Sequence, residues 1–259
     1  VMSFLLERSG EVKPATVAGD LSAIKGLVFH ARVMWSMDLK TVYFEEVSLK
    51  AKNLSLVGKS KERDIRPTLE ELAEIMSFYD RPKKRERGYS AKHPIPMHIL
   101  IPFQIFSTRR SAETTRILWT DLDVENKRVL VRDMKDPRGS KGNHKWCSLT
   151  DQALAIILAQ PRRDKRIFPY NHRSVEHSWA KARDWARMEH INYHDLRHEG
   201  TSRLFEIGLP IHHVQMVTQH GNWKILERYT HLVSLETFDK YEGWEPLKKA
   251  TASYVSLVA

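Results

Sequence analysis

The sequence of 259 residues contains only one cysteine, Cys147. A single cysteine excludes an intramolecular disulfide and is typical of a reducing compartment, so we expect a cytoplasmic protein. No apolar run is long enough to span a bilayer, and the first residues lack the basic and then apolar pattern of a secretory signal. Internal repeats and low-complexity segments are also missing. These absences favour an ordinary globular fold, and the 41% of hydrophobic residues can supply its core.

The charge balance is basic, with 42 Lys and Arg against 32 Asp and Glu, a formal net charge of +10 and a pI near 9.6. Such an excess suits a polyanionic partner, because each neutralised phosphate releases condensed counterions. Residues 81–92 carry six basic side chains against one Glu. A run of this kind is either a solvated loop or a segment that follows a DNA backbone. Charge alone leaves a nucleic-acid-binding protein and a merely basic protein both open.

Residues 1–58 are expected to form a helical domain. One apolar stripe with spacings of three and four residues predicts a long helix that begins near Pro14: Val17, Leu21, Ile24, Val28, Ala31 and Trp35. Residues 59–67 are mostly polar or charged and end in Pro67, which predicts a linker. Thr68-Leu69-Glu70-Glu71 is a capping-box pattern that starts the next helix. We therefore expect a second domain at 68–242 and a C-terminal tail at 243–259.

The second domain is expected to be mostly helical. Its later helices are predicted at 151–160, 174–187, 195–207 and 211–218, with a short one around 222–229. Residues 121–149 contain β-rich runs such as Val129-Leu130-Val131, separated by turn residues, which predicts a small antiparallel sheet. The fold class is therefore mainly α with a small antiparallel β-sheet, an α+β fold. Five tryptophans are assigned to packing in the core or between domains: Trp35, Trp119, Trp179, Trp185 and Trp244.

Three short polar islands, at 107–123, 193–200 and 220–232, carry the residue types that metal-free cleavage of a phosphodiester needs. Arginine can grip the non-bridging phosphate oxygens with its planar fork, and histidine can move protons near neutral pH. A lysine can protonate the leaving 5′-oxygen. A tyrosine can attack phosphorus if nearby positive groups favour its phenolate. In His194-x-x-Arg197 the two side chains lie on one face of a helix start, so both could reach one phosphate.

Taken together, the islands resemble the signature of the tyrosine recombinases of the phage-integrase type. The pattern His-x-Leu-Arg-His at 194–198 is followed by His220 and, nine residues after it, by Tyr229 within Arg228-Tyr229. Upstream, Arg110 is followed at its third and ninth positions by Glu and Trp, as in the family's first arginine motif, whereas Arg109 has Ala112 at the third position. Residues 130–137 resemble the β-hairpin lysine segment of a subgroup of phage and bacterial integrases. The similarity runs from about residue 10 to about residue 240.

The resemblance implies a site-specific DNA recombinase, or integrase, that cleaves and rejoins double-stranded DNA through a 3′-phosphotyrosine without metal, cofactor or external energy. It implies a homotetramer on a specific recombination site in a bacterial cytoplasm, away from membranes, with accessory DNA-bending or directionality factors as further partners. Residues 1–58 would be part of a helical core-binding domain that clasps DNA, truncated at its start, and 68–242 the catalytic domain. The implied roles are nucleophile for Tyr229, phosphate binding for Arg110 and Arg197, organisation of the first arginine for Glu113, general acid for Lys135, and phosphate hydrogen bonding with proton transfer for His194 and His220.

The chain departs from the family pattern within two of the motifs. The family has glycine two residues before the first arginine and Leu-Gly before the second histidine, and this chain has Thr108 and Thr218-Gln219 there. A non-glycine residue at these positions needs a different backbone path, which would reduce or abolish activity. Lys141 and Lys145 share the hairpin of Lys135 and are alternative general acids.

Three other interpretations stay open. His194 and His198 are four residues apart, as in zinc-binding helices, but Asp195 stands where a metalloprotease has its general-base Glu, so we expect no metal and a structural hydrogen bond from His198. A degenerate relative that binds DNA without cutting would form no covalent protein–DNA adduct. A type IB topoisomerase shares the same residue types, and it would relax supercoils as a single protomer without site preference.

Overall fold

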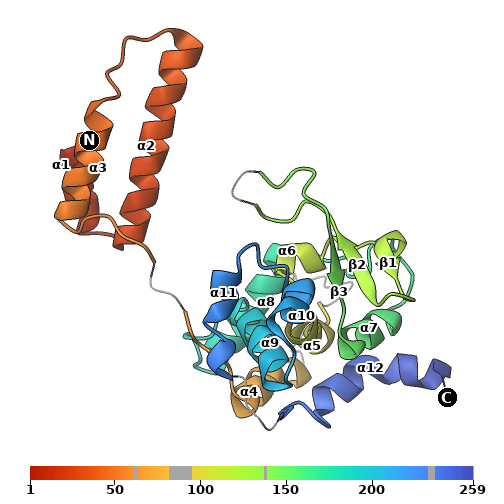
Figure 1. Ribbon diagram of the computed structural model, residues 1–259. Helices are drawn as coiled ribbons and strands as arrows, with labels where there is room; N and C mark the ends of the chain where they lie inside the picture. The colour runs from red at the N-terminus through yellow and green to blue at the C-terminus, as the bar shows by residue number, and fades with distance from the viewer. Residues whose placement is uncertain (61–62, 82–94, 137–138, 233–236, 259) are drawn as a thin grey trace, which may run out of the picture. The chain divides into compact units, whose positions relative to one another are not determined.

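The computed structural model describes residues 1–60, 63–81, 95–136, 139–232 and 237–258 (Figure 1). The chain forms two compact units, Val1–Arg63 and Asp64–Ala259, and each is considered by itself. The basic run at 81–92 lies outside the described residues except for Arg81, whose guanidinium stacks 4.8 Å from the ring of Trp185. None of the described helices is both long and apolar enough to cross a membrane.

The first unit consists of three helices: α1 (Met2–Ser9), α2 (Pro14–Trp35) and α3 (Tyr43–Asn53). Pro14 opens α2, and the expected apolar stripe is buried at Val17, Leu21 and Ala31 and half-buried at Ile24 and Val28. Trp35 is 63% exposed, so it lies outside the core of this unit. The reason is length: α1, which packs on α2, has only eight residues and spans about 12 Å, whereas the 22 residues of α2 span about 33 Å.

The second unit is built around α5 (Met97–Ser107). Nine of the eleven residues of this helix are buried, because its sequence is apolar on nearly every side. Five helices contact it: α4 (Leu69–Asp80), α7 (Asp151–Leu158), α8 (His172–Trp185), α9 (Asp195–Glu206) and α12 (Glu245–Val258). The preceding helix, α4 (Leu69–Asp80), begins with the expected capping box: the Thr68 hydroxyl accepts from the Glu71 N–H at 3.1 Å, and the Glu71 carboxylate accepts from the Thr68 N–H at 2.8 Å.

The expected sheet is confirmed between α5 and α7 in the sequence. After the short α6 (Ser111–Thr114) and the 3-10 helix η1 (Trp119–Asp121), the strands are β1 (Leu122–Asp123), β2 (Arg128–Val131) and β3 (Lys145–Ser148). They pair antiparallel in the order β1-β2-β3. Val129 and Cys147 are register partners and both are fully buried, so this face of the sheet packs on the helices. A mainly α fold with a small antiparallel sheet is therefore confirmed.

The later helices follow the predicted order. They are α7 (Asp151–Leu158), α8 (His172–Trp185), α9 (Asp195–Glu206), α10 (Ile211–Thr218), α11 (Trp223–Glu227), the 3-10 helix η2 (Thr230–Leu232) and α12 (Glu245–Val258). Helix α12 packs against α5 and α7 and buries Ala250. Residues 245–258 are thus a packed helix of the second unit rather than a free tail.

The expected linker at 59–67 is divided between the two units. From Asp64 onward its residues belong to the second unit. There Arg66 forms ion pairs with Glu199 at 2.9 Å and with Glu206 at 2.8 Å, both on α9. These contacts fix the end of the segment to the second unit.

Helices α5 and α9 approach closely at Gly200. A β-carbon on this residue would lie 1.9 Å from the carbonyl oxygen of Ile105, so only glycine fits. Arg197 is three residues earlier on α9, and the close approach places it at the C-terminal end of α5.

Candidate active site

Arg110 and Glu113 form a pair at the start of α6. The backbone N–H of Arg110 and one of its guanidinium nitrogens donate to the two carboxylate oxygens of Glu113, at 3.2 and 2.7 Å. The Glu113 side chain is 2% exposed, whereas that of Arg110 is 31% exposed. Burial alone would raise the pKa of Glu113, but three arginines outweigh it and hold the pKa below its usual value: Arg109, Arg110 and Arg197. Glu113 is therefore a buried anion that directs Arg110.

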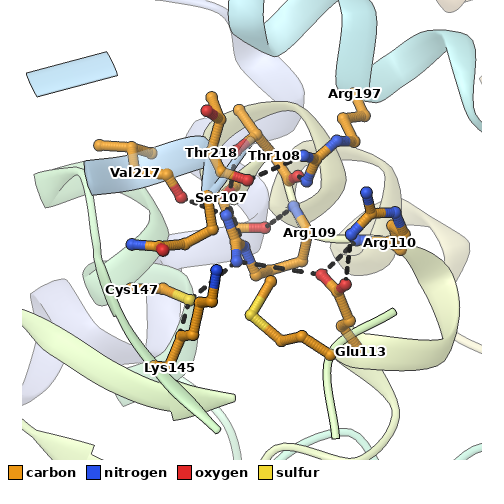
Figure 2. Close-up of polar contacts among 12 residues, drawn as sticks. Ser107, Thr108, Arg109, Arg110, Glu113, Lys145, Cys147, Arg197, Val217 and Thr218 are labelled. Atoms are coloured by element: carbon orange, nitrogen blue, oxygen red, sulfur yellow. Dashed lines mark hydrogen bonds and ion pairs between the residues drawn. The ribbon is translucent and has the colours of Figure 1, made fainter. Parts of the chain in front are cut away.

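Arg197 lies in the first turn of α9 and is 2% exposed. Its guanidinium donates to the carbonyl oxygens of Thr108 and Thr218, the second at 2.8 Å (Figure 2). These carbonyls belong to the ends of α5 and α10, so two helix ends orient one arginine. Burial, with added repulsion from Arg109 and Arg110, lowers the pKa of Arg197 to about 9.

His220 joins this cluster through Arg197 and Thr218. Its Nε2 lies 3.3 Å from a guanidinium nitrogen of Arg197, and its Nδ1 lies 2.8 Å from the Thr218 hydroxyl. Because a guanidinium can only donate, Nε2 is the acceptor and the Nδ1–H donates to Thr218. Burial and the charge of Arg197 lower the pKa of His220 to about 2, and desolvation with the same arginine lowers that of His194 to about 4. Both imidazoles are therefore neutral near pH 7.

A cavity of about 1030 Å³ lies beside the cluster. Its walls include Arg110, His194 and Lys135, together with Lys145 from β3. Lys141 is not among the described residues that line it. The cavity thus brings together three of the seven residues proposed from the sequence, and it leaves two lysines as candidates for one role.

Tyr229 lies apart from the cavity and is not among its described lining residues. It is 6% exposed and packs in a small apolar cluster, with its ring stacked on Phe205 at 6.1 Å between centroids. Its hydroxyl is 2.6 Å from Nδ1 of His198. Burial raises the pKa of Tyr229 in spite of Arg228 and Arg197, so the expectation that positive groups favour the phenolate does not hold in this arrangement.

The two departures from the family glycines, Thr108 and Gln219, both stand at the C-terminal end of a helix. Thr108 ends α5 at φ +55°, and Gln219 ends α10 at φ +54°, both in the left-handed region that glycine adopts freely. A left-handed conformation costs a residue with a side chain about 1 kcal/mol or more, so both turns are strained. The Gln219 side chain donates to the carbonyl of Trp146 at 2.9 Å, which ties this turn to β3.

Two residues at the site were missed or undervalued from the sequence. Arg109 is fully buried behind the cluster, although its motif spacing excluded it from the first-arginine role. His198 does form the hydrogen bond expected of it, but with the hydroxyl of Tyr229. Its position one turn after His194 was the available signal, whereas nothing in the sequence around Arg109 indicates burial.

These features define a domain of the tyrosine-recombinase class: a helical unit with a three-stranded sheet that gathers two arginines, two histidines and a buried glutamate beside a cavity. The sequence profile of the phage integrase family matches residues 66–235, more than half of the chain. The chain belongs to the phage integrase family.

Two curated relatives are a recombinase and an integrase. The chain is 23% identical over 233 residues to the shufflon-specific DNA recombinase of Escherichia coli, a match that covers 88% of this chain and 54% of that protein. It is 26% identical over 159 residues to the integrase of Salmonella phage P22, covering 53% of this chain and 39% of the integrase. The chain therefore spans about half or less of the length of these relatives.

Solved structures show the same fold. The Tn1549 transposon integrase in complex with transposon right end DNA matches with a TM-score of 0.57 and 14% identity, over 100% of this chain and 84% of that chain. The same integrase in complex with circular intermediate DNA gives a TM-score of 0.54 at 14% identity, over 93% and 82%.

Proposed function

We propose that this chain is a site-specific DNA recombinase that cuts and rejoins double-stranded DNA through a 3′-phosphotyrosine on Tyr229. The observation that carries the proposal is the buried Glu113 with Arg110 and Arg197 around it, next to a cavity that Arg110, His194 and Lys135 line. A scissile phosphate in this cavity would meet guanidinium groups that are already oriented. Preorganised positive groups of this kind stabilise the charge that develops on the non-bridging oxygens.

The chemical step needs one bond formed and one broken. The Tyr229 oxygen attacks phosphorus, the bond from phosphorus to the 5′-oxygen breaks, and Lys135 donates a proton to that oxygen. The phenol proton passes to a neutral imidazole, and we assign this role to His194 because it lines the cavity. Attack by a 5′-hydroxyl on the phosphotyrosine reverses the step and reseals the strand without external energy.

Tyr229 has to leave its contact with His198 before it can attack. The hydrogen bond to His198 is worth about 1 kcal/mol, and the packing of the ring on Phe205 has to be given up as well. The tyrosine follows α11, a helix of only five residues, and precedes η2, which has three. Such short elements can be rearranged at low cost, because few backbone hydrogen bonds hold them. We propose that DNA binding moves Tyr229 into the cavity.

The partner that fits this site is duplex DNA with a defined recombination site, bound by a homotetramer at the moment of exchange. The family membership and the basic charge of the chain support DNA as the substrate. The Tn1549 integrase, whose fold this chain shares, is solved with DNA. Whether the reaction integrates, excises or inverts DNA follows from the arrangement of the sites rather than from this cavity.

Trapping of a covalent adduct tests the proposal. The substrate is a nicked duplex made from the DNA that flanks the gene, so that the fragment released by cleavage diffuses away. We expect the wild-type chain to form a 3′-linked adduct on a denaturing gel. Tyr229→Phe should form none while its DNA affinity stays close to wild type, because only the phenol oxygen is removed.

The control is Tyr170→Phe, which removes a tyrosine hydroxyl elsewhere in the second unit and should leave the adduct unchanged. An adduct that persists in Tyr229→Phe would show that another residue is the nucleophile. DNA retention without any wild-type adduct would favour the binding-only relative. Relaxation of supercoils by single protomers without site preference would favour the topoisomerase.

A further inference from the structure

Arg109 is a fully buried arginine, with 0% of it exposed, in the loop between α5 and α6. Its Nε donates to the carbonyl oxygen of Ser107 at 3.1 Å, and its other nitrogens donate to the Val217 carbonyl and, at 2.9 Å, to the Sγ of Cys147 (Figure 2). The closest carboxylate oxygen, on Glu113, is 3.9 Å away. Most of its hydrogen bonds therefore go to the backbone and to a thiol, not to an acid.

These partners belong to three elements that surround the cluster. Ser107 is the last residue of α5, Val217 lies in the last turn of α10, and Cys147 is in β3. The carbonyls in the last turn of a helix have no partner within that helix. One guanidinium thus satisfies a terminal carbonyl of each helix and ties both ends to the sheet.

Both helices end in a strained residue. Thr108 and Gln219 hold left-handed backbone angles that a side chain disfavours. In a chain with glycine at these positions the turns would be unstrained. Arg109 also donates to the hydroxyl of Thr108 at 3.5 Å, so it contacts one strained residue directly. Near the other strained residue, Gln219, it holds the carbonyl of Val217, two positions earlier in the chain.

The same two helix ends hold Arg197 and His220. Thr108 and Thr218 supply the carbonyls that accept from Arg197, and the Thr218 hydroxyl fixes His220. The carbonyl that Arg109 holds, on Val217, precedes that of Thr218 by one residue. A shift of either helix end would therefore displace the acceptors that aim Arg197.

We propose that Arg109 is a positioning residue that holds the left-handed ends of α5 and α10 in place, so that the carbonyls of Thr108 and Thr218 aim Arg197 at the scissile phosphate. This inference rests on the proposed function. Arg109 acts through other residues, because it is fully buried and each of its three guanidinium nitrogens already donates to a protein acceptor: the Ser107 carbonyl, the Cys147 Sγ and the Val217 carbonyl. Its hydrogen bonds hold in place two left-handed turns that glycine would adopt without strain.

Substitution of Arg109 tests the proposal in two independent ways. Arg109→Met removes the fork, and Arg109→Lys keeps the charge but cannot reach the same set of acceptors. In both variants we expect amide hydrogen exchange to rise in peptides over 211–220 and to stay unchanged over 172–185. We also expect single-turnover cleavage at saturating DNA to slow about tenfold or more, while the Kd for DNA stays within about twofold, since misaim of one catalytic arginine acts on the transition state.

The matched control is Arg203→Met. Arg203 is also an almost fully buried arginine, paired with Asp239 and stacked on Phe106, away from the cavity. Its loss should lower the urea midpoint as the loss of Arg109 does, but cleavage at saturating DNA by the folded enzyme should stay within about threefold of wild type. A general loss of stability therefore cannot imitate the expected result.

Glycine rescue gives the sharpest outcome. Thr108→Gly and Gln219→Gly are introduced together into Arg109→Met. This triple variant should recover most of the cleavage rate of the reference, which carries the same two glycines and keeps Arg109. The reason is that helix ends without strain no longer need the Arg109 guanidinium. Rates restored by Arg109→Lys, or no recovery with the glycine pair, would overturn the proposal in favour of a charge effect. Unchanged exchange over 211–220 in both Arg109 variants would also overturn it. Absence of any wild-type cleavage would instead refute the proposed function. The exchange measurement would still test whether Arg109 holds the end of α10 in place.

Discussion

Gly200→Ala is the substitution whose effect follows most directly from the geometry of the second unit. An alanine β-carbon at this position would lie 1.9 Å from the carbonyl oxygen of Ile105 and 2.9 Å from its carbonyl carbon. These are backbone atoms of the central helix, so no side chain can rotate to make room. A normal carbon–oxygen contact requires about 3.3 Å, so α9 has to move away from α5 by more than about 1 Å.

The size of the effect is the balance of three contributions. Alanine favours the helical state over glycine by about 1 kcal/mol. Overpacking in a dense core costs about 1–3 kcal/mol. The separation of the helices also weakens the hydrogen bond from Arg197 to the Thr108 carbonyl, and a buried charged hydrogen bond is worth about 1.5–3 kcal/mol. We expect a net loss of about 2–4 kcal/mol.

Urea unfolding followed by circular dichroism measures this loss in the transition of the second unit. The matched control is Gly26→Ala in α2, where an added β-carbon would meet nothing within 4 Å. It should stabilise the first unit by about 0.5–1 kcal/mol. A Gly200→Ala protein with the wild-type midpoint would refute the close approach of α5 and α9, and with it the placement of Arg197 at the end of α5.

Three further predictions concern the chemistry. Lys135→Ala should slow cleavage of ordinary DNA by about two to four orders of magnitude and recover on a substrate with a 5′-bridging sulfur, which leaves without a proton. Lys141→Ala should only weaken salt-dependent binding, and sulfur rescue of Lys145→Ala instead would move the general acid to β3. The pKa of His220, about 2, lies below its unfolded value of about 6.5, so the unfolded chain binds the proton first and stability falls as pH is lowered from about 6.5. In urea titrations, His220→Gln should lose less stability between pH 7 and pH 5 than the wild type does. An equal loss in both proteins would contradict a buried neutral imidazole at His220. Chelation of magnesium and zinc should leave cleavage unchanged, because Arg110 and Arg197 supply the charge; activity lost in chelator and restored by metal would argue against the mechanism.

Local signals predicted most of the fold. The Thr68–Glu71 capping box is a contact within one helical turn, and the structure forms both of its hydrogen bonds. The β-rich run Val129-Leu130-Val131 and the turn residues after it predicted the sheet, because strands that are neighbours in sequence tend to pair with each other. Trp35 lies outside the core of the first unit, because a periodic stripe shows which face of a helix is apolar but not how long its packing partner is.

The features that remained hidden depend on contacts between segments distant in sequence. The burial of Arg109 depends on Val217 and Cys147, which are 108 and 38 residues away along the chain. A left-handed Thr108 contradicts local preference, and only the surrounding contacts can maintain it. The burial of Tyr229 against Phe205 and His198 is likewise a tertiary property. Motif spacing identifies which residue types belong to a site, but not how the folded chain packs and orients their side chains.

The charges of the arginine cluster around Glu113 suit the phosphate binding proposed for this site. Three guanidiniums, of Arg109, Arg110 and Arg197, share one buried carboxylate, on Glu113, so the cluster keeps an excess of positive charge. That excess, added to burial, disfavours the charged form of Arg197 and lowers its pKa. A bound phosphate would remove part of the repulsion, and because linkage is reciprocal, the repulsion within the cluster strengthens the attraction for the phosphate. The carbonyls of Thr108 and Thr218 accept hydrogen bonds from the Arg197 guanidinium and so stabilise it in its buried position without neutralising its charge. A carboxylate in their place would stabilise the free protein better, and it would compete with the DNA.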